Sequence, residues 1–391
     1  MRTFSAQYIF TNTGPPLKRG LITVGEDGTI TDVKDTGGNL QEKESVEFYN
    51  GIILPGFVNC HCHLELSNLK GLIPRGSGLP DFIMLIRETR ESCEEAMISS
   101  ISLADNAMES DGVVLCADIC NNASTFGIKI KSRIKYVNLI EVFGIDPDKV
   151  SRRMDEVLQL SQIARSSGMP YWLVPHSLYS LSLPLLRLLR SKTGSNKITS
   201  IHFMETPSEI TFLTNHNGPI MESYNKSGLG KGRLETVSNH AEGILEEVTS
   251  SGNLIMVHNT YADLETIQRV NSRKNLFWCL CPNSNLYIEN QLPPLDLLMK
   301  ENCDIVTGTD SLASNDGLSI LEELKTLQGS FPSVRLEDLI YWATLNGARA
   351  LDEEETFGSI QPGKKPGLLL LQDADLHEMK LLPESRTTRL V

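Results

Sequence analysis

Eight short apolar runs, separated by longer amphipathic stretches, constrain this chain more than any other feature of its sequence. Continuously apolar runs of this length are typical of parallel strands that are buried on both faces. The stretches between them, such as residues 81–110 and 151–168, have helical spacing. This repeated strand–helix alternation predicts a (β/α)₈ TIM barrel of the α/β class. The runs are residues 52–59, 113–119, 136–142, 171–176, 198–204, 253–258, 275–281 and 303–308.

The two ends of the chain do not follow this alternation. Residues 1–55 contain short strand-like segments, and residues 26–29 separate two of them as a hairpin turn would. Residues 352–391 return to strand character interrupted by Gly and Pro. We therefore expect both ends to form one small β-sandwich domain beside a barrel of residues 56–351. The long stretch 206–250 is expected to carry a helix and a loop over the active-site mouth.

The composition excludes several classes of protein. A formal net charge of −13 argues against non-specific binding to nucleic acid, which needs a basic surface. The first residues lack the apolar region of a signal peptide, and no apolar stretch is long enough to span a membrane. The eight cysteines are scattered, several of them inside apolar runs, as in a reduced cytoplasmic protein. We expect a cytoplasmic enzyme without nucleic-acid or membrane partners.

Histidines concentrate at the ends of the predicted strands. His61 and His63 follow the first run at positions i and i+2, so a strand end would direct both imidazoles to the same side. Such a pair alone is also compatible with two surface histidines. The sequence has only eight histidines, however, and five of them lie at the carboxyl ends of runs, where a barrel builds its active site. The further polar residues at these ends are His176, His202, His258 and Asp310.

The motifs around these residues resemble the amidohydrolase superfamily, in particular its deaminase and chlorohydrolase branch. They occur in that family's order, and the resemblance covers the chain from about residue 50 to residue 370. It implies that His61, His63, His202 and Asp310 bind one divalent metal ion, Zn²⁺ or alternatively Fe²⁺. The run 171–176 has no Lys that could bridge a second ion. The motifs are PGFVNCHCHLELS, HFMET, HN, CPNSN, GTDSLASN, ATLNGARAL and FGSIQPGK.

The resemblance also implies roles for the neighbouring residues. Glu205 matches the proton shuttle of the family's HxxE motif, and His258 matches the histidine that contacts the attacking hydroxide. Asp310 would act both as a metal ligand and as a base. His176 matches a residue that contacts the substrate, although a histidine satisfied within the core is the alternative. Four residues are expected to shape the loops after the last two strands: Asn283, Asn285, Ser314 and Asn315.

The HxxE glutamate favours hydrolytic deamination, because it can protonate a ring nitrogen while hydroxide attacks the adjacent carbon. The expected substrate is a small purine-like or other amino-heterocycle, as a base or a nucleoside. A chlorohydrolase or an amide hydrolase is the alternative, and a catalytically inactive scaffold is a third possibility. The segment after His63 resembles the aminodeoxyfutalosine deaminase group, which makes Glu65, Arg87 and Glu88 candidates for substrate binding. Homo-oligomers are common among such relatives.

Overall fold

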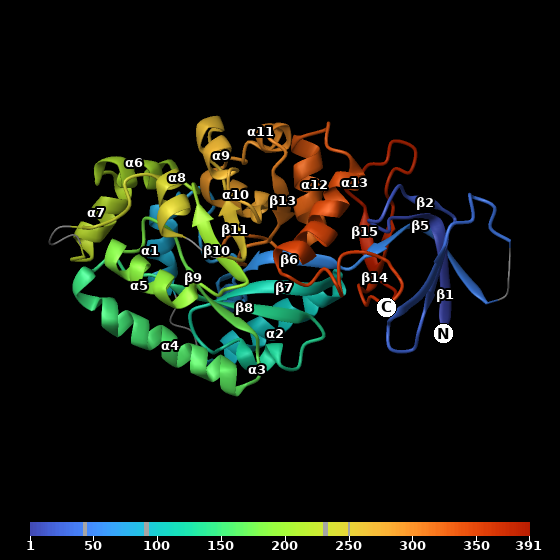
Figure 1. Ribbon diagram of the computed structural model, residues 1–391, viewed down its shortest axis with the longest axis horizontal. Helices are drawn as coiled ribbons and strands as arrows, with labels where there is room; N and C mark the ends of the chain where they lie inside the picture. Colours follow the sequence, from blue (N-terminus) through green and yellow to red (C-terminus); the bar gives the residue numbers. More distant parts are fainter. Residues whose placement is uncertain (42–44, 90–93, 230–233, 249–250) are drawn as a thin grey trace.

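Two four-stranded parallel sheets form the centre of the molecule (Figure 1). The computed structural model describes residues 1–41, 45–89, 94–229, 234–248 and 251–391. The first sheet consists of β6 (Phe57–Cys62), β7 (Val113–Cys120), β8 (Lys135–Val142) and β9 (Tyr171–Pro175). The second consists of β10 (Ile198–Phe203), β11 (Asn253–His258), β12 (Leu276–Leu280) and β13 (Asp304–Thr307). Each of the eight predicted apolar runs overlaps one of these strands.

The two sheets touch at both of their edges. Parallel bridges join Ser177 to His202, beyond the end of β9, and Cys62 to Asp310, beyond the end of β13. At the second junction the Asp310 amide donates to the His61 carbonyl oxygen over 3.1 Å. Both junctions lie at the carboxyl ends of the strands, so they bring residues from distant parts of the sequence to one place.

The strands are buried because apolar side chains cover both of their faces. Every residue of β6 and β7 is buried, as parallel strands between helices require. Close approaches of the backbone depend on glycine at two positions next to β6. A Cβ atom on Gly56 would lie 2.3 Å from Val114 Cγ1, and one on Gly308 would lie 2.8 Å from His61 Cβ. Gly308 thus allows the segment that carries Asp310 to pass directly beside His61.

Helices follow the strands, as the amphipathic stretches predict. The predicted helical stretch 81–110 covers α2 and most of α1, and its residues 90–93 lie outside the described part. The helices are α1 (Leu79–Thr89), α2 (Glu94–Ser110), α3 (Phe126–Lys129), α4 (Val150–Ser166), α5 (Leu183–Thr193), α9 (Leu264–Val270), α10 (Pro282–Glu289), α11 (Leu295–Lys300), α12 (Ile320–Ser330), α13 (Leu336–Tyr341) and α14 (Gly347–Ala350). Shorter helical turns are η1 (Leu64–Leu69), η2 (Pro147–Lys149) and η4 (Trp342–Asn346). No helix within the described residues has the length and apolar character needed to cross a membrane.

The stretch 206–250 is more helical than predicted. It contains α6 (Pro207–Asn215), α7 (Pro219–Lys226), α8 (His240–Glu242) and the π-helical turn η3 (Gly243–Glu247), while residues 230–233 and 249–250 lie outside the described part. A Pro stands in the first turn of α6 and of α7, where it costs no helical hydrogen bond. Side chains of α7 line the central pocket described below, which places this stretch beside the site.

Strands from both chain ends pair in a third sheet at one end of the molecule (Figure 1). Within the described residues these strands form a single seven-stranded sheet, so the expected β-sandwich stays a prediction. The antiparallel pairing of β3 with β4 confirms the hairpin predicted around residues 26–29. The strands are β1 (Arg2–Ile9), β2 (Leu17–Lys18), β3 (Leu21–Val24), β4 (Ile30–Lys34), β5 (Val46–Pro55), β14 (Leu368–Gln372) and β15 (Arg386–Arg389).

Candidate metal centre and active site

Three histidine rings meet where the two parallel sheets join. His61 and His63 lie at the end of β6 and His202 lies on β10. Nε2 of His63 is 3.2 Å from Nε2 of His61 and 3.3 Å from Nε2 of His202. Two nitrogens bound to the same tetrahedral Zn²⁺, each at about 2.05 Å, would be separated by about 3.3 Å. The three side chains therefore have the spacing of ligands around one cation.

Asp310 completes this cluster from the second sheet. Its Oδ1 lies 3.7 Å from His61 Nε2 and 3.5 Å from His63 Nε2. Its Oδ2 accepts hydrogen bonds from the hydroxyls of Ser284, at 2.6 Å, and Ser314, at 2.7 Å. The two hydroxyls fix the carboxylate so that Oδ1 faces the histidines.

Two residues of the site have left-handed backbone conformations. Asp310 has a φ of 56° and His258 has a φ of 74°. For residues other than glycine such conformations cost about 1–3 kcal/mol and are often found at functional sites. Here they turn the chain at the last residue of β11 and shortly after β13, and both residues line the central pocket.

Hydrogen bonding selects the ring nitrogen that faces the cluster in His202. Its Nδ1 donates to the His176 carbonyl oxygen over 2.8 Å and lies 3.6 Å from Glu141 Oε1. A proton on Nδ1 leaves the lone pair of Nε2 directed at the other two histidines, as metal binding requires. His61 Nδ1 is buried and has no hydrogen-bond partner among the described residues.

The electrostatics of the site favour neutral imidazoles beside a charged carboxylate. Burial and the neighbouring His61 lower the pKa of His63 to about 3. Burial and the adjacent His176 also hold the pKa of His202 well below its usual range. Burial alone would raise the pKa of Asp310, but the adjacent His61 and the other nearby imidazoles bring it well below its usual value. Neutral imidazole and ionised carboxylate are the forms that bind metal ions.

Glu205 and His258 form a second pair beside the cluster. Oε1 of Glu205 lies 3.5 Å from Nε2 of His258, and both side chains are buried. The Asn285 side-chain amide donates to His258 Nδ1 over 3.2 Å, so a neutral His258 carries its proton on Nε2, toward Glu205. Burial and the negative charge of Asp310 raise the pKa of Glu205 well above its usual value. This environment favours the protonated form of the Glu205 carboxyl.

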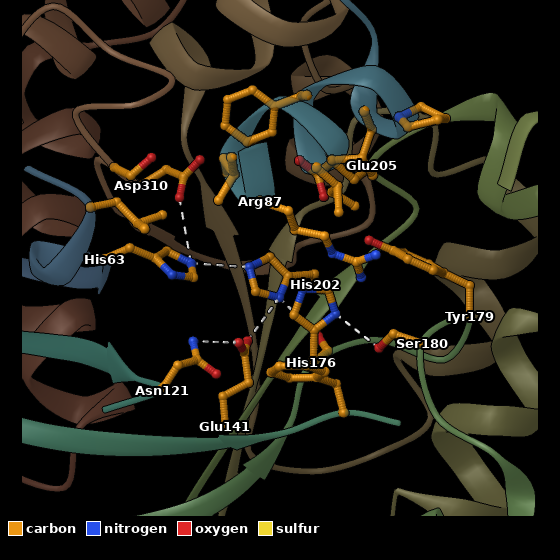
Figure 2. A pocket seen from close by; sticks show the side chains of 18 of the residues that line it. His63, Arg87, Asn121, Glu141, His176, Tyr179, Ser180, His202, Glu205 and Asp310 are labelled. Carbon is orange, nitrogen blue, oxygen red and sulfur yellow. Dashed lines mark hydrogen bonds and ion pairs between the residues drawn. The ribbon is translucent and has the colours of Figure 1, made fainter. Parts of the chain in front are cut away.

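A pocket opens directly onto these groups (Figure 2). His176, Glu65 and Arg87 line it together with the metal cluster, whereas Glu88 lies on the exposed side of α1 and lines a different surface hollow. His176 Nδ1 lies 2.9 Å from the Ser180 hydroxyl, and burial lowers the pKa of His176 to about 4. The walls are largely apolar and include Leu66, Phe82, Ile83, Ile86, Phe143, Tyr179 and Tyr224.

Sequence reasoning missed one acidic residue of the pocket, Glu141. It stands inside the apolar run 136–142 on β8, where the sequence offered no sign of a polar role. The side-chain Nδ2 of Asn121 donates to Glu141 Oε2 over 3.0 Å, and the backbone N–H of Asn121 donates to Glu65 Oε2 over 3.0 Å. Glu141, His176 and His202 also offer three closely spaced donor atoms. Glu141 thus links the wall of the pocket to the metal cluster.

A further acidic residue, Glu209, holds the backbone of Glu205. Its Oε2 accepts from the Glu205 amide over 3.0 Å, and its Oε1 lies 2.8 Å from His240 Nε2. Glu209 and His240 are both buried. The spacing in the sequence could have pointed to this contact, because Glu209 stands one helical turn after Glu205, at the start of α6.

Comparison with known proteins agrees with this geometry. A sequence model of the amidohydrolase family matches residues 52–387. Adenosine deaminase of Helicobacter pylori is 26% identical over 331 residues, which covers 82% of this chain and 79% of that protein. The structure of H. pylori aminofutalosine deaminase in complex with methylthio-coformycin has a TM-score of 0.80, with 22% identity, and covers 96% of this chain and 93% of the other.

A third similar protein carries a metal. The structure of an adenosine deaminase from Xanthomonas campestris with bound zinc has a TM-score of 0.71 and 19% identity, and covers 97% of this chain and 86% of the other. At this identity the structural likeness concerns the fold alone. The match to the family covers most of the chain and confirms the resemblance inferred from the motifs. The chain therefore belongs to the amidohydrolase family.

Proposed function

We propose that this protein is a metal-dependent hydrolase that removes the exocyclic amino group of a purine-like ring as ammonia. The observation that carries the proposal is the position of Glu205, a buried carboxyl with a raised pKa, beside His258 and the histidine cluster. Deamination of such a ring needs a group that can give a proton to a ring nitrogen at neutral pH. The names of the similar proteins support the same reaction.

The donor set fits one divalent cation, with Zn²⁺ as our proposal and Fe²⁺ as the alternative. His61, His63, His202 and Asp310 would hold it, since three imidazoles and a carboxylate suit either ion. When bound, such an ion lowers the pKa of a water ligand to about 7 and so supplies a nucleophile at neutral pH. The zinc in the similar Xanthomonas protein supports this assignment.

The residues around the cation would move the protons of the reaction. Glu205 takes one proton from the attacking water and gives it to the ring nitrogen next to the carbon under attack. His258 orients the attacking oxygen. Asp310, as a base, takes the second proton of the water and passes it to the amino group, which leaves as ammonia when its bond to the ring carbon breaks. His176 and Glu65 would bind the heterocycle at the polar end of the pocket, while the apolar walls contact its faces.

The alternative reaction replaces chloride or cleaves an amide with the same nucleophile. Cleavage of an amide needs no protonated ring nitrogen, so Glu205 favours attack on a heterocycle, and the names of the similar proteins favour ammonia over chloride as the leaving group. An inactive scaffold is the least suitable reading, since all four proposed ligand side chains converge.

We also propose that the eight parallel strands close into one barrel, spanning residues 56–351. The two edge bridges, between Cys62 and Asp310 and between Ser177 and His202, support closure. Residues 1–55 and 352–391 would then form the composite small domain, because their strands share one sheet. Its arrangement as a β-sandwich remains part of this proposal.

A reducing compartment, such as the cytoplasm, is our proposal for the location of the protein. All seven described cysteines are free thiols, and six of them are buried. Proteins of oxidising compartments more often pair their cysteines.

The experiment is a screen for ammonia release with the purified, metal-analysed protein. We expect about one equivalent of a divalent metal and release of ammonia from at least one adenine, guanine or cytosine compound. Chlorinated and amide-bearing heterocycles are measured in parallel. If only these latter compounds react, the deaminase assignment is wrong; if the protein purifies without stoichiometric metal and is inactive on all of them, the scaffold reading replaces it.

A further inference from the structure

The turn that leads into Glu205 has an unfavourable backbone conformation. Met204, directly before Glu205, has a left-handed φ of 48°. For a residue other than glycine this conformation costs about 1–3 kcal/mol and persists only where surrounding contacts hold it. One such contact comes from the segment after β11, because the Tyr261 N–H donates to the Met204 carbonyl oxygen over 2.9 Å. The direction of the Glu205 side chain therefore depends on the groups around this turn.

A buried carboxylate holds the other side of the turn. Glu209 is fully buried, and its Oε2 accepts from the backbone N–H of Glu205 over 3.0 Å. Residues 206–209 have the spacing of a capping box, with Thr206 as the N-cap of α6. In a capping box the glutamate accepts from the N–H of the cap residue, whereas Glu209 contacts the residue before it. The contact thus reaches past the helix end to Glu205.

The second oxygen of Glu209 contacts a histidine from a later part of the chain. Its Oε1 lies 2.8 Å from Nε2 of His240, in the first turn of α8. A carboxylate can only accept hydrogen bonds, so His240 donates from Nε2. The His240 ring also packs edge-on against Phe203 at the end of β10, with ring centroids 5.5 Å apart. Helices α6 and α8 therefore meet beside the end of this strand (Figure 1).

The pair of Glu209 and His240 is not explained by substrate contact or by stability. Neither residue is among those that line the central pocket. Both are buried, with exposed fractions of 0% and 6%. Replacing a buried polar pair by apolar residues of similar volume is often neutral or even stabilising. What the polar pair adds is a hydrogen bond of defined direction on the backbone of Glu205.

We propose that Glu209 and His240 are positioning residues that hold Glu205 within reach of the substrate ring nitrogen. The stretch 206–250 would thereby contribute to turnover through residues that do not touch the substrate. The inference rests on the function proposed above, because it requires Glu205 to be the proton shuttle. A displacement of a catalytic group by about 1 Å can slow turnover on the order of 10²-fold, so loss of the pair should act on kcat.

Two substitutions of Glu209 test the first contact. The probe is ammonia release from the amino-heterocycle that reacts fastest in the screen described above. Glu209→Leu removes both hydrogen bonds, so kcat should fall about 10–100-fold while KM and metal content change little. Glu209→Gln can still accept from the Glu205 N–H and can donate to a His240 whose proton has moved to Nδ1, so at least about a third of kcat should remain. If glutamine is as damaging as leucine, Glu209 supplies charge and the positioning role is wrong.

Two substitutions of His240 test the second contact. His240→Phe keeps a ring against Phe203 but removes the donor, so kcat should fall about tenfold. His240→Gln supplies a donor again and should restore most of this loss. His377→Phe is the matched control, because His377 contacts Glu378 over 2.8 Å at an exposed site and its side chain is 92% exposed. The control should keep the kcat of the unaltered enzyme.

A double-mutant cycle shows whether the pair acts through Glu205. In Glu205→Gln the side chain can no longer transfer a proton, so its exact position loses importance. Adding His240→Phe to this variant should lower kcat by no more than about twofold further. If the two losses multiply instead, the pair acts on another part of the site and the proposal is wrong.

The outcomes separate this inference from the proposed function. Near-normal kcat in Glu205→Gln, or no ammonia release from any amino-heterocycle, contradicts the proposed function. If Glu205→Gln is slow but Glu209→Leu and His240→Phe match the control, the positioning role fails while the function stands. If neither of these two variants yields folded, metal-loaded protein by denaturant unfolding and metal analysis, the pair is a stability element and the positioning role fails as well.

Discussion

The inner pocket at the metal cluster and the adjoining outer cavity beside the start of α4 are built differently. At the inner end, His61 and His202 lie on strands and Asp310 lies just after one, and all three are buried. A backbone carbonyl orients His202, and hydroxyl groups orient Asp310. At the outer end, cationic side chains such as those of Lys149 and Arg152 extend from helical segments and are 60% and 79% exposed. The contrast separates the chemistry, which needs fixed groups, from selection of the substrate, which can tolerate mobile ones.

The largest expected effect at the inner end is on turnover, from Glu205→Gln. The amide keeps the shape of the side chain but cannot carry a proton from water to the ring, so kcat should fall by about 10²–10⁴-fold. KM and metal content should change little. Steady-state kinetics and metal analysis would check this, with Glu265→Gln, an exposed substitution on α9, as the control. Near-normal kcat would remove Glu205 from the mechanism.

The largest expected effect on the free energy of unfolding comes from a buried ion pair next to the segment that carries His63. Lys129 on α3 pairs with Asp118 on β7, and both side chains are almost fully buried. Asp118 Oδ1 also accepts from the Leu64 amide over 2.7 Å, directly after His63. Lys129→Met leaves the carboxylate uncompensated and should lower the free energy of unfolding by about 3–5 kcal/mol.

Denaturant unfolding of three variants would test this. The double variant Lys129→Met/Asp118→Asn should recover part of the loss, because no uncompensated charge remains. Asp118→Asn alone keeps the side-chain oxygen but removes its charge from Lys129, so it should also destabilise. A loss below about 1 kcal/mol for Lys129→Met would show that water or rearrangement compensates the carboxylate.

A smaller effect is expected from Ser314→Ala. The variant removes one of the two hydroxyls that bind Asp310 Oδ2, and Ser284 keeps the other. Outer-shell partners of metal ligands typically contribute 10–100-fold in affinity, so we expect a loss of about tenfold. Competition with a chelator measures it, with the exposed Ser166→Ala as the control. Equal metal affinity in both variants would mean that Ser284 suffices.

The smallest effect should come from the outer end. Arg152 forms an exposed ion pair with Glu156 at the start of α4, and such pairs contribute little in water. Arg152→Gln should change the free energy of unfolding by no more than about 0.5 kcal/mol in a denaturant titration. A change above about 1.5 kcal/mol would remove the contrast in rigidity between the two ends.

Much of the inner site could be predicted from the sequence, because its signals are local. Apolar runs mark the strands, and His61, His63 and Asp310 directly follow such runs. Asp118 and Lys129 gave no comparable signal, since their pairing depends on how β7 and α3 pack, which no local pattern specifies. Charged residues inside an apolar run or a short helix become meaningful only once the register between neighbouring strands is known.

The outer end was predicted less well for a geometric reason. Arg87 and Glu88 were both candidates for substrate binding, yet only Arg87 lines the pocket. Consecutive residues on a helix point about 100° apart, so α1 turns Arg87 but not Glu88 into the central pocket, while both border a surface hollow. The spacing after His63 predicted a helix but not its rotation, which its packing beside α7 and α10 determines.

The sheet formed by the chain ends has a consequence for biosynthesis. β5, which leads directly into the first strand at the active site, lies between β1 and β14, and Arg2 donates to the Leu390 carbonyl oxygen over 3.3 Å. A ribosome delivers β1 and β5 early, but their remaining neighbour emerges only after all eight parallel strands. One edge of β5 therefore stays unpaired until β14 has been synthesised, and during that interval the exposed edge can pair with other chains unless a chaperone covers it.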